Sequence, residues 1–124
     1  MKPFRFSVSL AALIVTASLI VMAQNPAPAN APRGNAENGR VLFAKFGCYE
    51  CHGREAQGST ATGPRLGPNP IAYNRFLSYI RKPAGEMPPY TAKVVTDAQA
   101  ADIYAFLQAL PRPPAVESIP LLRP

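Results

Sequence analysis

Cysteine, histidine and tryptophan are scarce in this chain of 124 residues, which has two cysteines, one histidine and no tryptophan. A structural zinc site usually takes four Cys or His ligands, so a zinc site here would need a carboxylate or a second molecule as well. The sequence also lacks the alternation of apolar and polar residues that is typical of β-strands, and it has no internal repeat and no glycine-rich phosphate loop. We therefore expect neither a sheet nor a phosphate site of that kind.

The scarce residues lie together in the pentapeptide Cys48-Tyr49-Glu50-Cys51-His52. Two thiols three positions apart can each add to one vinyl group of the same porphyrin, and a histidine directly after the second thiol can bind the iron. The motif therefore predicts one covalent haem c, attached at Cys48 and Cys51, with His52 as the proximal ligand of the iron.

Two simpler interpretations of the cysteine pair fit less well. A redox dithiol of the thioredoxin type expects a βαβ pattern around Cys-x-x-Cys, whereas the flanking residues have a helical pattern. A disulfide between Cys48 and Cys51 would close too short a loop to stabilise the fold much through chain entropy. We therefore favour haem attachment.

Residues 1–23 have the features of a secretory signal peptide. Basic residues precede an apolar run of about 15 residues, from Val8 to Met22, and Ala23 follows it. A transmembrane helix needs roughly 20 apolar residues, so we expect cleavage after Ala23 and a periplasmic protein. An uncleaved anchor to the outer face of the inner membrane is the alternative, because Phe4 and Phe6 extend the apolar stretch.

The rest of the chain divides into three parts. Residues 24–34 are rich in Pro and Ala and predict a linker, residues 35–110 predict one small domain, and residues 111–124, with five prolines, predict an extended tail. A core of this size is marginal, and haem would supplement it with a large apolar surface.

The formal net charge is +6, and loss of Lys2 and Arg5 with the signal would lower it to +4. Two haem propionates would bring the charge to about +2. This modest charge does not favour a nucleic-acid partner, and we expect none.

Helical patterns fill the domain, so we predict an all-α fold of three main helices wrapped around one haem. The first helix is capped by Asn35 and runs into the haem motif. The second is expected to start at Asn69-Pro70, with asparagine as the cap and proline at the first helical position, and to stop at Pro83. Residues 53–68 are expected to form a loop around the haem.

The third helix opens on a capping box, in which Thr96 is followed three positions later by Gln99, and it ends at Pro111. Apolar residues recur at helical spacing in both later helices. They are Tyr73, Phe76, Leu77 and Ile80 in the second helix, and Ala100, Ile103, Phe106, Leu107 and Leu110 in the third.

The second axial position of the iron has few candidates. His52 is the only histidine, and two of the three methionines lie in the predicted signal peptide. Met87 is left, in a loop stiffened by the two prolines that follow it, because proline fixes φ. We predict Met87 as the distal ligand, with Lys82 or Lys93 as alternatives.

With these residues the chain resembles the small mono-haem class I cytochromes c of bacteria. The resemblance covers about residues 35–110 and is most specific at the haem motif. Gly39 with Phe43, and Ile103 with Phe106, resemble the residues at which the first and last helices of that family cross. The resemblance implies a close contact between those two helices, with glycine allowing the backbones to approach.

Two further segments resemble the family. Gly63-Pro64-Arg65-Leu66 is similar to its Gly-Pro-x-Leu segment, which implies that the Pro64 carbonyl accepts a hydrogen bond from the proximal imidazole. Residues 85–90 are similar to its methionine loop. Because the chain has no tryptophan, any propionate contact made by tryptophan in relatives must be absent or replaced. The candidates are Tyr73, Tyr79, Tyr90, Arg54, Arg65 and Arg75.

Ligation by His52 and Met87 would leave no open position on the iron, which favours electron transfer over catalysis. We therefore expect a carrier of single electrons between redox protein partners, such as a dehydrogenase, an oxidase or another cytochrome, and not an enzyme. One alternative is a fixed haem c subunit of a periplasmic dehydrogenase or oxidase complex. Another is a haem sensor or enzyme from which Met87 dissociates.

Overall fold

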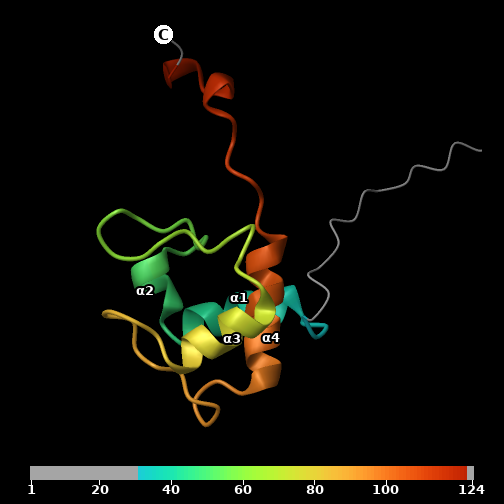
Figure 1. Ribbon diagram of the computed structural model, residues 1–124. Coiled ribbons are helices and arrows are strands. Elements are labelled where there is room, and N and C mark those ends of the chain that lie inside the picture. Colours follow the sequence, from blue (N-terminus) through green and yellow to red (C-terminus); the bar gives the residue numbers. More distant parts are fainter. Residues whose placement is uncertain (1–30, 123–124) are drawn as a thin grey trace, which may run out of the picture.

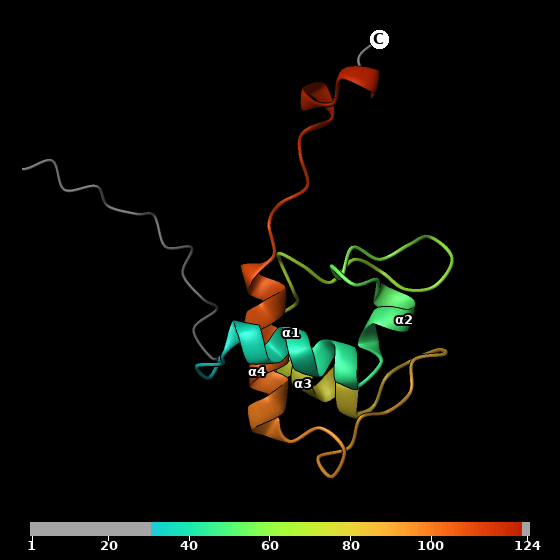
Figure 2. The ribbon, with the colours of Figure 1, turned by 180° about the vertical axis from the view of Figure 1, so that it is seen from behind.

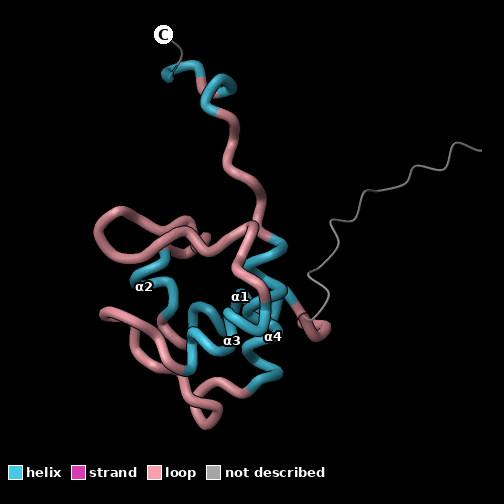
Figure 3. The backbone as a smooth tube through the Cα atoms, viewed as in Figure 1, coloured by secondary structure: helices cyan, strands magenta, loops and turns pink. Residues whose placement is uncertain are grey.

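The computed structural model describes residues 31–122, which are helical with long irregular connections (Figure 3). The helices are α1 (Ala36–Lys45), α2 (Cys48–His52), α3 (Tyr73–Arg81) and α4 (Asp97–Ala109), followed by the 3₁₀ turns η1 (Val116–Ser118) and η2 (Pro120–Leu122). Within this described range no strand occurs, so the predicted all-α class is confirmed. The predicted signal peptide and most of the predicted linker lie outside the described residues.

Helices α1 and α4 cross at the centre of the fold (Figures 1 and 2). Gly39 of α1 faces the backbone of α4, and a Cβ atom at this position would collide with the carbonyl oxygen of Asp102. The rings of Phe43 and Phe106 pack together across the same crossing, with their centroids 5.4 Å apart. The close glycine contact and the aromatic pair implied by the family resemblance are therefore present.

Polar contacts fix the start of α1. Asn35 caps the helix as predicted, since its side chain accepts a hydrogen bond from the backbone N–H of Asn38. Asp102 of α4 accepts from the backbone N–H of Asn35 and from the side-chain amide of Asn38, each at 2.7 Å. The crossing is thus held by a carboxylate at one end and by packed rings further along.

Helix α1 ends before the haem motif, whereas the sequence pattern predicted a helix running into it. Gly47 has a φ of +73°, in the left-handed region that glycine adopts without steric cost, and it breaks the helix. The motif residues then form the separate single turn α2. Its direction is therefore independent of that of α1.

The predicted start of the second helix at Asn69-Pro70 is wrong, because α3 begins at Tyr73. The carbonyl of Ile71, which a longer helix would use internally, instead accepts a hydrogen bond of 3.1 Å from the hydroxyl of Tyr104. Ala72, the residue before α3, has a ψ of 141°, so the backbone is extended there and the helix cannot start earlier, while the Tyr104 bond holds Ile71 against α4. The helix ends at Arg81, ahead of Pro83 as predicted.

The capping box of α4 is formed as predicted. The Thr96 hydroxyl accepts from the backbone N–H of Gln99, and the Gln99 side chain accepts from the backbone N–H of Thr96. The apolar face predicted for this helix is buried, with Leu110 packed at its edge. The core unites α1, α3 and α4 with two loop residues, Ala56 and Val95. The helical members are Leu42, Phe43, Tyr73, Phe76, Ile80, Ala100, Ala101, Ile103, Tyr104, Phe106 and Leu107.

Two long loops flank α2. Residues 53–72 extend on one side of it and residues 82–96 on the other, in both views of the ribbon (Figures 1 and 2). The tail that follows α4 leads away from the helices and ends in η1 and η2. The sequence predicted an extended tail, but residues 116–118 and 120–122 form 3₁₀ turns instead. The Leu121 side chain in this tail is 95% exposed.

Candidate functional site

The two cysteines lie on the single turn α2, three positions apart and therefore on the same face of the helix. Both thiols are free, with Cys48 half-buried and Cys51 exposed. Burial raises the pKa of the Cys48 thiol. Two free thiols on one face of a short helix can bond to neighbouring vinyl groups of one porphyrin, so this pair fits haem c.

His52 is 8% exposed, and its Nδ1 atom lies 2.9 Å from the carbonyl oxygen of Pro64. A carbonyl oxygen can only accept, so Nδ1 carries the hydrogen of this bond. With the hydrogen on Nδ1, Nε2 is the ring nitrogen that can offer a lone pair to a metal. The contact between Pro64 and the imidazole that the resemblance implied is present. It fixes the orientation of the ring, as a metal-ligating histidine requires.

Hydrogen bonds to backbone carbonyls of α2 hold the loop that carries Pro64 against this helix. The hydroxyl of Thr62 donates to the carbonyl of Cys51 at 2.6 Å, and the N–H of Gly58 donates to the carbonyl of His52 at 2.8 Å. A Cβ atom at Gly63 would lie 2.9 Å from Nδ1 of His52, closer than such contacts normally come. Glycine at this position therefore lets the backbone approach the ring. The role of Thr62 had no signal in the sequence.

Met87 lies in the loop between α3 and α4, where it is half-buried and packs against the core. The loop is closed at its base by a hydrogen bond of 2.8 Å from the N–H of Tyr90 to the carbonyl of Ile80. A thioether is a soft ligand that suits haem iron. Met87 therefore has suitable chemistry in a closed loop, and its place at the iron stays a prediction.

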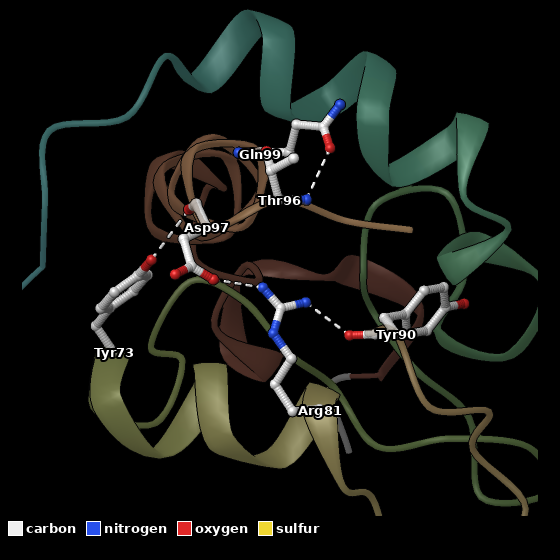
Figure 4. A network of polar contacts seen from close by, with 6 residues as sticks. All are labelled: Tyr73, Arg81, Tyr90, Thr96, Asp97 and Gln99. Carbon is white, nitrogen blue, oxygen red and sulfur yellow. Dashed lines mark hydrogen bonds and ion pairs between the residues drawn. The ribbon is translucent and has the colours of Figure 1, made fainter. Parts of the chain in front are cut away.

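A polar network joins this loop to two helices (Figure 4). The guanidinium of Arg81 donates to the carbonyl of Tyr90 and to a carboxylate oxygen of Asp97, each at 2.6 Å. The hydroxyl of Tyr73 donates to the carbonyl of Asp97 at 3.3 Å. Sequence reasoning missed this network, because a basic residue in the last turn of a helix is common without any partner.

Tyr90 also bonds toward the haem motif. Its hydroxyl donates to the carbonyl of Phe46, the residue that caps the end of α1, at 3.0 Å. Burial raises the pKa of Tyr90 to about 12, and the neighbouring Cys48 adds to the rise. The side chain is therefore a neutral donor at physiological pH.

The six propionate candidates differ in how their polar groups are used. Tyr73 and Tyr90 donate their hydroxyl hydrogens to backbone carbonyls, so neither is free to donate to a propionate. The guanidinium of Arg54 lies over the ring of Tyr49, 5.0 Å from its centroid. The remaining candidates have exposed side chains, and they are Tyr79, Arg65 and Arg75.

A family model described as cytochrome c oxidase, cbb3-type, subunit III matches residues 34–107, which is more than half of the chain. The chain belongs to this family of cytochromes c. The match shows a bacterial mono-haem domain of the class I type, with covalently bound haem c and its iron. Haem c supplies one-electron chemistry when bound. No curated protein matches the chain, and no solved structure does.

The cytochrome c domain belongs to a class that is typically extracellular or periplasmic. Between residues 31 and 122, no helix combines the length and the apolar character that crossing a membrane requires.

Proposed function

We propose that this cytochrome c domain passes single electrons between redox protein partners through iron bound by His52 and Met87. The observation that carries the proposal is the hydrogen bond of 2.9 Å between Nδ1 of His52 and the carbonyl of Pro64. A bond from the second ring nitrogen fixes the orientation of a ligating imidazole and raises its basicity. The same bond leaves Nε2 as the ring nitrogen whose lone pair can bind the iron.

Two protein ligands suit electron transfer because they close the iron to oxygen, peroxide and other substrates. The thioether of Met87 favours the ferrous state and so raises the reduction potential. His52 and Met87 would stay in place in both oxidation states, which keeps the reorganisation of the site small. Partners would dock briefly, through a contact at the low end of interface sizes.

Replacement of Met87 tests the ligation. We expect Met87→Ala to abolish the weak far-red absorption band that sulfur bound to ferric iron produces, and to lower the reduction potential. Leu77→Ala is a suitable control, because Leu77 is also a partly buried side chain packed against the core. A far-red band that survives in Met87→Ala would contradict Met87 as the ligand. A wild-type protein without that band would point to a nitrogen ligand such as Lys82 or Lys93.

We also propose that residues 1–23 direct export and are removed, so that the domain works in the periplasm. The charged start, the apolar run and Ala23 support this. The mass of the holoprotein purified from its host would show Gln24 as the first residue. A mass that includes residues 1–23 would instead support the membrane-anchored alternative.

A second candidate is a fixed haem c subunit of an oxidase or dehydrogenase complex. The description of the matching family, which names an oxidase subunit, favours it, and so does a tail with exposed apolar side chains at Val116, Leu121 and Leu122. Purification from the native host separates the two candidates. Co-migration with a large subunit that is lost when residues 111–124 are removed would support the fixed subunit and contradict a free carrier.

A further inference from the structure

The loop that carries Met87 begins and ends at the same turn of α3. It leaves the helix after Arg81 and returns at Tyr90, whose N–H donates to the carbonyl of Ile80 at 2.8 Å. The guanidinium of Arg81 donates to the carbonyl of Tyr90 at 2.6 Å. Both backbone groups of Tyr90 are therefore bound to the last turn of α3, and they close residues 82–89 into a loop.

The outer part of this loop has little to hold it. Ala84, Gly85 and Glu86 are exposed, and a Cβ atom at Gly85 would meet nothing within 4 Å. Pro88 and Pro89 are exposed as well, although they restrict the backbone. The position of Met87 therefore depends on the base of the loop and on the packing of Met87 itself.

A third bond connects the base of the loop with the haem motif. The hydroxyl of Tyr90 donates to the carbonyl of Phe46 at 3.0 Å. Phe46 caps α1 and is followed by Gly47, the residue from which α2 starts. Tyr90 thus links the segment that carries Met87 directly to the segment that leads into the haem motif.

Arg81 is itself held in place by α4. Its second terminal nitrogen, Nη2, donates to the carboxylate of Asp97 at 2.6 Å, and the Arg81 side chain is only 21% exposed. The planar guanidinium offers several donors in a rigid fork, which lets one side chain bridge the carbonyl of Tyr90 and the carboxylate of Asp97. A lysine has one nitrogen and a flexible stem, so it cannot reproduce this bridge with the same geometry.

We propose that Tyr90 and Arg81 are positioning residues that hold the Met87 loop closed and so slow the dissociation of the thioether from the iron. This inference rests on the proposed ligation by Met87. A neutral thioether leaves the iron when its loop opens, and opening requires the bonds at Tyr90 to break. Each such hydrogen bond contributes enough to change an opening equilibrium by about fivefold.

The test measures how fast Met87 leaves the iron of the ferric holoprotein. At saturating cyanide, the rate at which the far-red band disappears equals the rate of Met87 dissociation. We expect Tyr90→Phe to raise this rate about fivefold. Tyr104→Phe is the matched control, because its hydroxyl also donates to a backbone carbonyl, that of Ile71 at 3.1 Å, away from the loop. We expect this control to change the rate by less than about twofold.

Arg81 is tested in the same way against Arg40, which also pairs with a carboxylate but lies on the exposed side of α1. We expect Arg81→Gln to raise the dissociation rate about tenfold and Arg81→Lys to raise it by less, because lysine keeps the charge but not the fork of donors. We expect Arg40→Gln to leave the rate unchanged.

Denaturant unfolding of all variants separates positioning from general stability. We expect Tyr104→Phe to lose at least as much stability as Tyr90→Phe while its dissociation rate stays near that of the wild type. Equal rate increases in the two tyrosine variants would overturn the positioning role and leave the ligation intact. A wild-type protein without the far-red band would overturn the ligation by Met87 and this inference with it.

Discussion

The two sides of the predicted haem site are held by different kinds of contact. On the proximal side, Thr62 and Pro64 bond to residues only 11 and 12 positions away, namely Cys51 and His52. On the distal side, the bond from Tyr90 to Phe46 spans 44 positions. The predicted proximal ligand is thus held within one continuous segment, whereas the loop of the predicted distal ligand depends on parts of the chain that only the folded domain brings together.

This difference indicates how the domain responds when it is perturbed. A proximal site made of short-range contacts and two covalent attachments resists partial unfolding, because little of the chain must stay ordered to keep it. A distal loop with an exposed outer part opens when its few long-range bonds break. We therefore expect damage to the fold to release Met87 well before it releases His52.

Removal of both attachment points has the largest expected effect. Cys48→Ala with Cys51→Ala should abolish covalent haem, because no other cysteine is present in the chain. Haem staining of a denaturing gel measures this directly. Cys48→Ala alone should retain stain through the remaining thioether. A double variant that keeps its haem after denaturation would contradict the attachment and, with it, the comparison between the two sides.

A denaturant titration tests whether the Met87 loop opens before the helices unfold. In urea, the far-red band of the ferric protein should disappear at a lower concentration than the helical circular dichroism, since the Met87 loop has fewer buried contacts than the crossing of α1 and α4. Tyr90→Phe should widen the gap between the two midpoints. Coincident midpoints in the wild type would show that the distal loop opens only when the whole domain unfolds.

The proximal side was largely predictable from the sequence because its chemistry is local. Spacing alone placed Cys48, Cys51 and His52 on one short segment, and the family resemblance implied the contact of His52 with Pro64, which is present. Gly39 and Phe106 were likewise recognisable through the family resemblance, which implied the close helix contact that is present.

The distal network was not predictable, because it depends on how α3, α4 and the loop meet in space. Arg81 and Asp97 are 16 positions apart and belong to no recognisable motif. The late start of α3 also involves a distant part of the chain, since the carbonyl of Ile71, just before the extended Ala72, accepts a hydrogen bond from Tyr104 of α4. Local patterns cannot report such a tertiary contact.

Gly63→Ala perturbs the proximal side without touching the distal loop. The added Cβ would lie 2.9 Å from Nδ1 of His52 and should push the Pro64 carbonyl away from the ring. A weaker hydrogen bond makes the imidazole less basic and stabilises the ferric state less, so the reduction potential should rise. For a bond weakened by about 1 kcal/mol the rise is at most about 40 mV, because any weakening that is equal in the ferric and ferrous states cancels. Voltammetry measures the change. Ala61→Ser, at an exposed position of the same loop, should leave the potential unchanged.

The smallest expected effect is at Tyr90, which links the two sides. Burial raises its pKa above the ordinary 10.0, and in the haem-free chain the free thiols of Cys48 and Cys51 add to the rise. Thioether formation removes the charge of both thiols, so burial remains the main cause of the raised pKa in the holoprotein. The folded protein therefore keeps a proton that the unfolded chain loses near pH 10, so the stabilisation is complete below about pH 10 and is lost as the pH rises through the raised pKa of the folded state. An ionised Tyr90 cannot donate to Phe46, so the distal loop should loosen in this range while the bond between His52 and Pro64 is unaffected. Burial raises the pKa of Tyr73 and Tyr104 as well, so near-ultraviolet titration of the holoprotein should show late tyrosinate steps from three tyrosines. Tyr90→Phe should remove one of them, and Tyr90→Phe with Tyr104→Phe should remove two. If Tyr90→Phe leaves the amplitude of the late titration unchanged, Tyr90 does not titrate there, and its hydroxyl is less firmly held than the bond to Phe46 implies.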